Sequence, residues 1–212
     1  MAKMATLKDS FVSSALDTTK WTPFTGGSAT LSYGNGVTCN YPASSTSSTD
    51  GDISSNTTYD LTSSYAFVQV TGTPSASTLA DATFQVRINS SNMCNWTFEG
   101  GTLYAQKLVS NSRTTLNSFA YNASTHAWWQ IRESGGVTYW ETSSDGLNWV
   151  VRASQSNPIA VTALTVVLAG TCFQNETNPG TFTWANFNNL NSDGPYNHLR
   201  VQNGMSRSEV AN

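Results

Sequence analysis

The stretch from residue 121 to residue 152, YNASTHAWWQIRESGGVTYWETSSDGLNWVVR, constrains the fold more than any other part of the chain. It holds four of the seven tryptophans and two turn signals, Gly135-Gly136 and Asp145-Gly146. Glycine-containing pairs of this kind favour two-residue turns between antiparallel strands. The stretch therefore predicts three consecutive β-strands joined by tight turns.

Two-residue turns also predict which side chains share a face, because side chains alternate between the two faces of a strand. A bulge at Asp145-Gly146 would shift the third strand by one residue and exchange its faces. Without a bulge, the core face holds Trp129, Ile131, Trp140, Trp149 and Val151. The opposite face is polar but aromatic, and it holds Trp128, Gln130, Arg132, Tyr139, Glu141 and Arg152.

Short alternating segments, separated by Gly, Pro and Asn pairs, continue on both sides of this stretch. They predict about thirteen or fourteen strands, and helical periodicity is not sustained anywhere. The segment 163–171, ALTVVLAGT, is the most apolar, so we expect it to lie centrally in a sheet. The fold class that follows is all-β, a two-sheet antiparallel sandwich of jelly-roll type.

Two segments stand outside this strand pattern. Residues 42–58, PASSTSSTDGDISSNTT, predict a long loop in which Asp50-Gly51-Asp52 forms a turn. Calcium binding by its two carboxylates is the weaker alternative. The strand pattern ends at Asn191, so we predict a sandwich domain over 1–190 and a C-terminal tail over 191–212 that is either disordered or docked on a neighbour.

Composition argues against several classes of protein. The formal net charge is −3 with no basic run, which excludes the usual electrostatic footprint of a nucleic-acid binder. No apolar run is long enough to span a bilayer, and MAKMATLKDS lacks the apolar core of a secretory signal. The widely spaced Cys39, Cys94 and Cys172 favour buried free thiols, with one bridge and a leftover thiol as the alternative, and they do not predict a zinc site. We expect no metal and no cofactor.

Three segments resemble concanavalin A-like lectin and glucanase domains. Asp9-Ser10-Phe11, followed by Leu16-Asp17 and Trp21, resembles the opening of these domains. HAWWQIRE (126–133) after Tyr121-Asn122, and YWETSSDGLNW (139–149), resemble a characteristic strand and the hairpin that follows it. Gln130 departs from the family, which usually carries Arg there. The resemblance covers residues 8–190 and implies a jelly-roll sandwich.

Such domains occur in minor tail and fibre-like proteins of phages and in bacterial surface proteins, so the resemblance also implies where the protein is located. Only 11% of the residues are charged, and the Ser- and Thr-rich surface is typical of proteins exposed outside cells. A virion component made in the host cytoplasm and released by lysis would combine such a surface with the lack of an export signal. An extracellular location is the alternative.

Some enzymes of this superfold hydrolyse β-glucans with two carboxylates in an E-x-D-x-x-E strand, where the acid and the nucleophile lie roughly 5 Å apart. This sequence contains no such string. Glu133 and Glu141 fall on opposite predicted faces, and Asp145 lies in a turn. His126 and His198 have no partners arranged for nucleophilic catalysis. We therefore expect a protein that is not an enzyme and has no catalytic residues.

The polar-aromatic face is the candidate glycan-binding site, because rings can stack on sugars while amide, carboxylate and guanidinium groups bind hydroxyls. In the structural alternative, Arg132 stacks on Tyr139 beside Glu141, or a loop or subunit covers the face. The leading hypothesis is a non-enzymatic phage virion protein of tail or fibre type, with host-surface glycan as its candidate ligand. The alternatives are a bacterial carbohydrate-binding module or lectin and a glycoside hydrolase. Expected partners are other virion proteins, contacted through the tail, in a homo-oligomer or larger assembly, without nucleic acid or membrane insertion.

Overall fold

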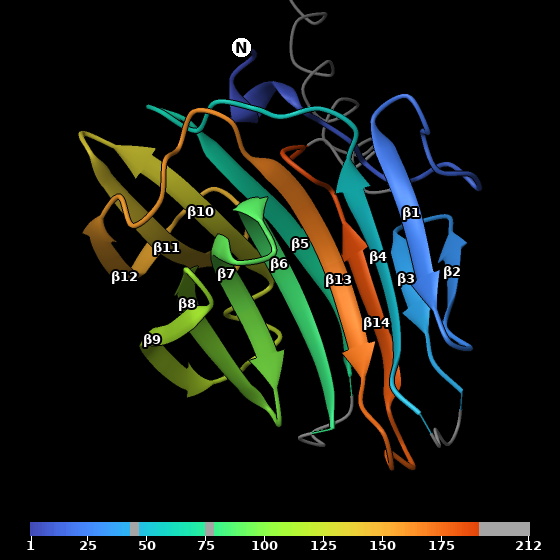
Figure 1. The fold of residues 1–212 in the computed structure, drawn as a ribbon. Helices are drawn as coiled ribbons and strands as arrows, with labels where there is room; N and C mark the ends of the chain where they lie inside the picture. Colours follow the sequence, from blue (N-terminus) through green and yellow to red (C-terminus); the bar gives the residue numbers. More distant parts are fainter. Residues whose placement is uncertain (43–46, 75–78, 191–212) are drawn as a thin grey trace, which may run out of the picture.

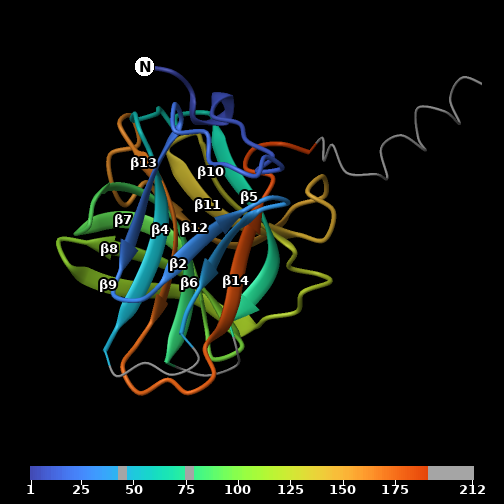
Figure 2. The same cartoon turned by 90° about the vertical axis from the view of Figure 1, so that its right-hand side faces the viewer.

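Two antiparallel sheets packed face to face make up the computed structural model, which describes residues 1–42, 47–74 and 79–190. The front sheet has the strand order β1-β4-β13-β6-β7-β8-β9, and the back sheet has the order β12-β11-β10-β5-β14-β3-β2 (Figure 1). Figure 2 looks onto the edge of the sandwich formed by β1 and β2. This architecture confirms the predicted two-sheet jelly-roll sandwich.

Fourteen strands and one short 3-10 helix, Met4–Thr6, form the described part of the chain. The strands of the front sheet are β1 (Trp21–Gly26), β4 (Thr49–Ser55), β6 (Ala80–Asn89), β7 (Asn92–Glu99), β8 (Thr102–Val109), β9 (Ser112–Ala120) and β13 (Thr165–Cys172). Those of the back sheet are β2 (Thr30–Tyr33), β3 (Val37–Asn40), β5 (Tyr65–Pro74), β10 (Trp128–Ser134), β11 (Val137–Ser143), β12 (Val150–Ser156) and β14 (Gly180–Ala185). The apolar 163–171 segment forms β13, which lies between β4 and β6, as predicted.

Large aromatic side chains fill the space between the sheets. Trp129 and Trp184 meet edge to face at 5.3 Å, a favourable geometry for aromatic pairs. Two indoles also cross the core. Trp96 of the front sheet donates its Nε1–H to the Gln130 carbonyl at 2.9 Å, and Trp140 of the back sheet donates to the Asn95 carbonyl at 3.1 Å. These reciprocal hydrogen bonds join β7 to β10 and β11.

Replacing Trp140 with Phe should lower the free energy of unfolding by about 2–4 kcal/mol, because a buried hydrogen bond is lost and a cavity is left. Urea denaturation followed by circular dichroism measures this change. Val150→Ala is the control, since Val150 is exposed and its truncation should cost less than about 0.5 kcal/mol. Equal midpoints for the two variants would contradict a contribution of the indole to stability.

The first predicted hairpin, between β10 and β11, is confirmed. Gly135 and Gly136 form the turn with φ values of 63° and 83°, a conformation that glycine adopts without strain. The register pairs Ile131 with Trp140, and both side chains point into the core. The tryptophans 129 and 140 are therefore core residues, as predicted.

The second predicted turn is wrong. A longer loop joins β11 to β12, because Ser143 Oγ accepts the Asp145 and Gly146 N–H groups and Asp145 accepts those of Leu147 and Asn148. This loop shifts the pairing by one residue from the predicted register, so Glu141 pairs with Val151. A bulge beyond this pair leaves Arg152 unpaired and places Ala153 opposite Trp140. The one-residue shift made by the loop is what exchanges the faces of Val150 and Val151. Val151, predicted in the core, is 51% exposed, and Trp149, predicted there too, lies outside the core cluster.

The predicted loop over 42–58 contains a strand, β4, and the predicted turn at Asp50-Gly51-Asp52 is wrong. Thr49, Gly51 and Ile53 alternate inward, whereas Asp50 and Asp52 project outward. Two of these inward residues are small or polar, so the alternation carries little hydrophobic signal. A Cβ at Gly51 would lie 2.7 Å from Cys39 Sγ, which shows how closely the sheets approach there.

Other predictions concern single residues and the chain ends. Cys39, Cys94 and Cys172 are free and buried, as predicted. No group of three or more His, Cys, Asp or Glu side chains within the described residues could hold a metal ion. Among these residues there is also no helix long and apolar enough to cross a membrane. The predicted tail, 191–212, lies outside the described residues.

Candidate functional site

The structure brings most of the predicted glycan-binding residues together on the outer face of the back sheet. Gln130 pairs with Glu141, Arg132 pairs with Tyr139, and Trp128 lies two residues before Gln130 on the same face. Trp128 is only 8% exposed, because Gly146 of the β11–β12 loop packs against its ring. Its ring therefore forms part of the support for this loop and is not a free stacking surface.

Arg152 does not belong to this face. Arg152 is the unpaired residue of the bulge, and its side chain points away from the outer face. Arg152 Nε donates to Thr142 Oγ1 at 2.9 Å, and the guanidinium lies 5.0 Å from the Phe119 ring centroid. These contacts attach β12 to β9 at one end of the sandwich. The prediction that Arg152 shares a face with the other five residues is wrong, because the longer loop shifts the register of β12 and the bulge leaves Arg152 unpaired.

Arg132 and Glu141 form a bidentate ion pair. Arg132 Nε and Nη2 donate to the two Glu141 carboxylate oxygens at 3.0 and 2.9 Å, and this hydrogen bonding raises the pKa of Arg132. The guanidinium also lies 4.2 Å from the centroid of the Tyr139 ring. The predicted structural pairing of these residues is present, and it holds both charged groups in fixed positions.

Beside this pair the outer face is hollowed into a pocket of about 330 Å³, which we call the aromatic pocket. The rings of Tyr65 and Phe67 stack 5.6 Å apart, and the Trp149 ring lies 5.7 Å from that of Phe67. The sequence pattern places Trp149 in the core and does not single out the other two rings. The lining residues are Tyr65, Phe67, Gln130, Arg132, Glu141, Gly146, Leu147, Trp149 and Leu190.

The outer face of the front sheet carries a second cluster of polar side chains, most of which are carboxylic acids. Strand pairing places Asp50, Thr171, Asp81 and Glu99 in one row across β4, β13, β6 and β7. Asp52 lies on the same face of β4, two residues further along. A Cβ at Gly26, the partner of Asp50 on β1, would overlap the Asp50 carboxylate, so glycine leaves room for this acid.

Asp81 and Glu99 are direct partners in this row, on adjacent strands. Burial, and next the negative charge of Glu99, raise the pKa of Asp81 to about 6, although a hydrogen bond from Thr171 opposes the shift. Asp81 Oδ1 is buried and has no hydrogen-bond partner among the described residues. The pair therefore combines a carboxyl that keeps its proton up to about pH 6 with a second carboxyl beside it.

Polar side chains continue along the same face beyond the carboxylate row. Asn95 and Thr97 of β7 lie next to Gln106 of β8, and all three are buried although they face away from the core. Asn95 Nδ2 donates to Thr97 Oγ1 at 2.7 Å and to Gln106 Oε1 at 3.3 Å. Gln106 Nε2 donates onward to Thr115 Oγ1 of β9 at 3.2 Å. This network offers fixed hydrogen-bonding groups beside the acids.

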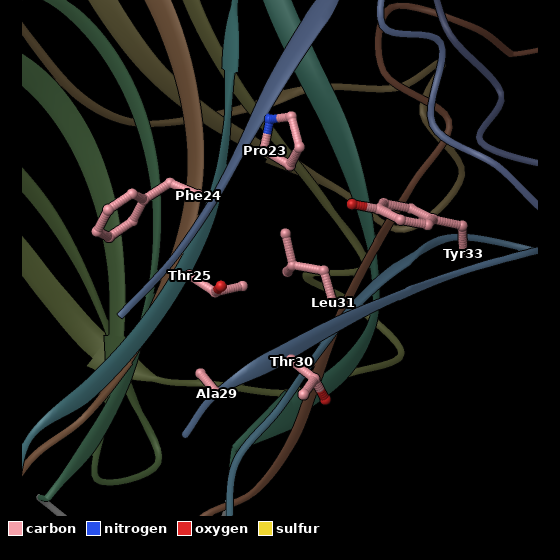
Figure 3. Close-up of a pocket in the computed structure, with 7 residues that line it drawn as sticks. All are labelled: Pro23, Phe24, Thr25, Ala29, Thr30, Leu31 and Tyr33. Carbon is pink, nitrogen blue, oxygen red and sulfur yellow. The ribbon is translucent and has the colours of Figure 1, made fainter. Parts of the chain in front are cut away.

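A further hollow of about 360 Å³ lies at the open edge of the sandwich, between β1 and β2. Figure 3 shows the side chains of Leu31 and Tyr33 directed into this space from β2, with Pro23 opposite on β1. No carboxylate, amide, histidine or cysteine lines it. It therefore lacks the groups needed for acid–base chemistry.

Neither a family model nor a curated protein matches the sequence. Solved structures do match. The apo Crh5 transglycosylase is 13% identical, with a TM-score of 0.62 over 88% of this chain and 85% of its own. The β-glucanase of Bacillus licheniformis is 9% identical, with a TM-score of 0.57 over 85% of this chain and 96% of its own. A native glycosidic hydrolase gives the same identity and TM-score over 85% of this chain and 93% of its own. These similarities confirm a concanavalin A-like jelly-roll fold.

The prediction that the chain is not an enzyme is contradicted by these neighbours, which are glycoside hydrolases and transglycosylases. That prediction was based on the absence of an E-x-D-x-x-E string, and it therefore assumed that both catalytic acids would lie within one strand. In this fold Asp81 and Glu99 meet from two strands, so a search within one strand cannot find them. None of these comparisons tests the phage setting.

Proposed function

We propose that the chain is a carbohydrate-active enzyme, a glycoside hydrolase or transglycosylase, whose active site is centred on the Asp81–Glu99 pair in the carboxylate row of the front sheet. The Asp81–Glu99 pair is the observation that carries the proposal. Glycosidic bonds are cleaved by two carboxyl groups with different tasks, one protonated and one ionised. Asp81, whose pKa is raised to about 6, is suited to the task of the protonated carboxyl, and Glu99 lies directly opposite it for the second task.

Asp81 and Glu99 are paired directly across two strands, which leaves little room for a water between their carboxyl groups and favours a retaining mechanism. Side chains that face each other on neighbouring antiparallel strands begin about 4.5–5.5 Å apart at Cβ. In retaining enzymes the two carboxyl groups lie about 5–5.5 Å apart, whereas inverting enzymes leave room for a water between them. The Glu99 carboxylate would attack the anomeric carbon while Asp81 donates its proton to the departing glycosidic oxygen.

The second half of the reaction uses the same two groups. The ionised Asp81 takes a proton from water or from a sugar hydroxyl, and that oxygen then displaces Glu99 from the anomeric carbon. Water gives hydrolysis, and a sugar acceptor gives transglycosylation. The amide and hydroxyl groups of Asn95, Thr97 and Gln106 are placed to hydrogen-bond the substrate hydroxyls near the acids.

The anomeric configuration of the first product tests this proposal. The protein would be incubated with soluble β-glucan, xylan and chitin oligosaccharides, and the new reducing ends would be followed by proton NMR before they mutarotate. We expect the configuration of the cleaved linkage to be retained. Inverted products would exclude Glu99 as a nucleophile, and a lack of cleavage of all these substrates and of the α-linked glucan controls would contradict the enzymatic function.

The pH dependence of activity should follow Asp81. Because the protonated carboxyl is required and its pKa is about 6, kcat/KM should fall tenfold for each pH unit above about 6. Initial rates from pH 4 to pH 9 at low substrate concentration measure this basic limb. A profile that stays flat between pH 6 and pH 8 would show that Asp81 is not the general acid.

A further inference from the structure

The aromatic pocket lies on the opposite outer face of the sandwich from the carboxylate row, so it cannot be part of the same binding site. Tyr65 and Phe67 project outward from β5, whose inward residues Ala66 and Val68 are in the core. Trp149 closes the pocket from the loop before β12. Three rings thus surround one cavity at the surface of the back sheet.

Polar groups at the base of the pocket are fixed and close to the rings. Gln130 is 4% exposed and Glu141 is 3% exposed, and both line the cavity with Arg132. Each Glu141 oxygen accepts one hydrogen bond from Arg132, and a carboxylate has about four acceptor positions. Glu141 therefore keeps capacity for hydroxyl donors, and the Gln130 amide offers both a donor and an acceptor.

The charges of the pocket indicate the class of ligand. Arg132 and Glu141 neutralise each other, so the base of the pocket attracts neither an anion nor a cation strongly. A ligand that suits it presents an apolar face to the rings and several neutral hydroxyls to the polar base. A pyranose ring has this chemistry, and a cavity of about 330 Å³ lies within the usual size range of small-molecule sites.

We propose that the aromatic pocket is a second carbohydrate-binding site, which holds a pyranose unit of a neutral polysaccharide. This site does not depend on the Asp81–Glu99 pair. Because the two sites face in opposite directions, binding at the pocket would keep the protein attached to a polysaccharide while the front sheet engages another segment or chain. Two linked weak sites bind a multivalent surface far more tightly than either site alone.

The test is affinity electrophoresis of the full chain in gels containing soluble β-glucan, xylan or the acidic polysaccharide polygalacturonate. We expect retardation by a neutral polysaccharide, and an apparent affinity reduced about tenfold or more in Trp149→Ala and in Tyr65→Ala. Val151→Ala is the matched control, since Val151 is an exposed apolar residue of β12 that does not line the pocket. Unchanged circular dichroism and melting temperature show that each variant folds.

Three outcomes would overturn the second site: equal retardation of wild type and both pocket variants, retardation by polygalacturonate alone, and no retardation in any gel. Cleavage and pocket binding are measured separately, because they depend on different residues. Glu99→Gln should retain binding at the pocket, and Trp149→Ala should retain cleavage of short soluble oligosaccharides. Loss of pocket binding with intact cleavage, or the reverse, therefore distinguishes the failure of one proposal from that of the other.

Discussion

Glu99→Gln should reduce the rate of polysaccharide cleavage by about 10³-fold or more while leaving substrate affinity nearly unchanged. Glutamine preserves the size and the hydrogen-bonding reach of the side chain, but its amide cannot form the covalent glycosyl intermediate. The loss should therefore appear in kcat and not in KM. Reducing-end assays at saturating and limiting substrate separate the two constants.

Chemical rescue makes this prediction specific to a nucleophile. In Glu99→Ala, a small anion such as azide can occupy the vacated space and attack the anomeric carbon, so azide should restore part of the activity. A residue with only a structural role would not respond to azide. Asp50→Asn is the matched control from the same row of the sheet. If that variant loses activity and Glu99→Gln keeps it, the chemistry lies at β4 and the assignment of the pair is wrong.

Asp81→Asn should abolish cleavage and, at the same time, stabilise the folded protein above pH 6. The pKa of Asp81 is raised from 3.8 to about 6 by folding, so the folded state binds the proton more tightly than the unfolded state. Stability linked to this group is fully present below about pH 4 and is lost as the pH rises towards 6. The shift corresponds to about 2–3 kcal/mol, which the asparagine variant should regain at pH 8.

Urea denaturation at pH 4, 6 and 8 measures this effect as the difference between wild type and variant. Asp145→Asn provides a control of opposite sign. The pKa of Asp145 is lowered, first by hydrogen bonds from the Asn148 and Leu147 N–H groups, so its contribution to stability is present above its unfolded pKa and lost on acidification. If Asp81→Asn were less stable than wild type at pH 8, the claim that the buried, ionised Asp81 lowers the free energy of unfolding would be wrong.

Local turn chemistry decided how well each strand could be predicted. Gly135-Gly136 fixes a two-residue turn, and the faces of β10 and β11 follow correctly from it. Asp145-Gly146 suggests the same turn. There, however, the Ser143 hydroxyl and the Asp145 carboxylate bind backbone N–H groups of a longer loop, and this loop shifts the register by one residue and exchanges the faces of Val150 and Val151. A Gly-containing dipeptide does not reveal that neighbouring side chains will bind these backbone N–H groups and lengthen the loop.

The candidate sites were harder to predict because they depend on register between strands that are distant in sequence. Asp50, Asp81 and Glu99 meet only through the order β4-β13-β6-β7, which no local pattern encodes. Four residues of the predicted glycan face, Gln130, Arg132, Tyr139 and Glu141, do share a surface, because they lie within one hairpin. Tyr65 and Phe67 come from β5, about sixty residues earlier, a separation that local periodicity cannot bridge.

The virion setting, the partner proteins and the role of the 191–212 tail stay predictions. The fold is shared by enzymes with different substrates, and a fold alone does not determine the assembly in which a protein works. Co-purification of the full chain with tail or capsid proteins from particles would test the setting directly. A protein recovered only free of particles would contradict the virion hypothesis.

The two indole hydrogen bonds across the core have a mechanical consequence. Trp96 binds the backbone of Gln130, which lines the aromatic pocket, and Trp140 binds the backbone of Asn95, which belongs to the network beside the acids. The strand under the aromatic pocket and the strand under the polar network are thus hydrogen-bonded to the opposite sheet across the core, and the two sheets are about 10 Å apart. The molecule would behave as a stiff two-sided adaptor, in which the separation of two sugar chains is set by the core and not by any loop.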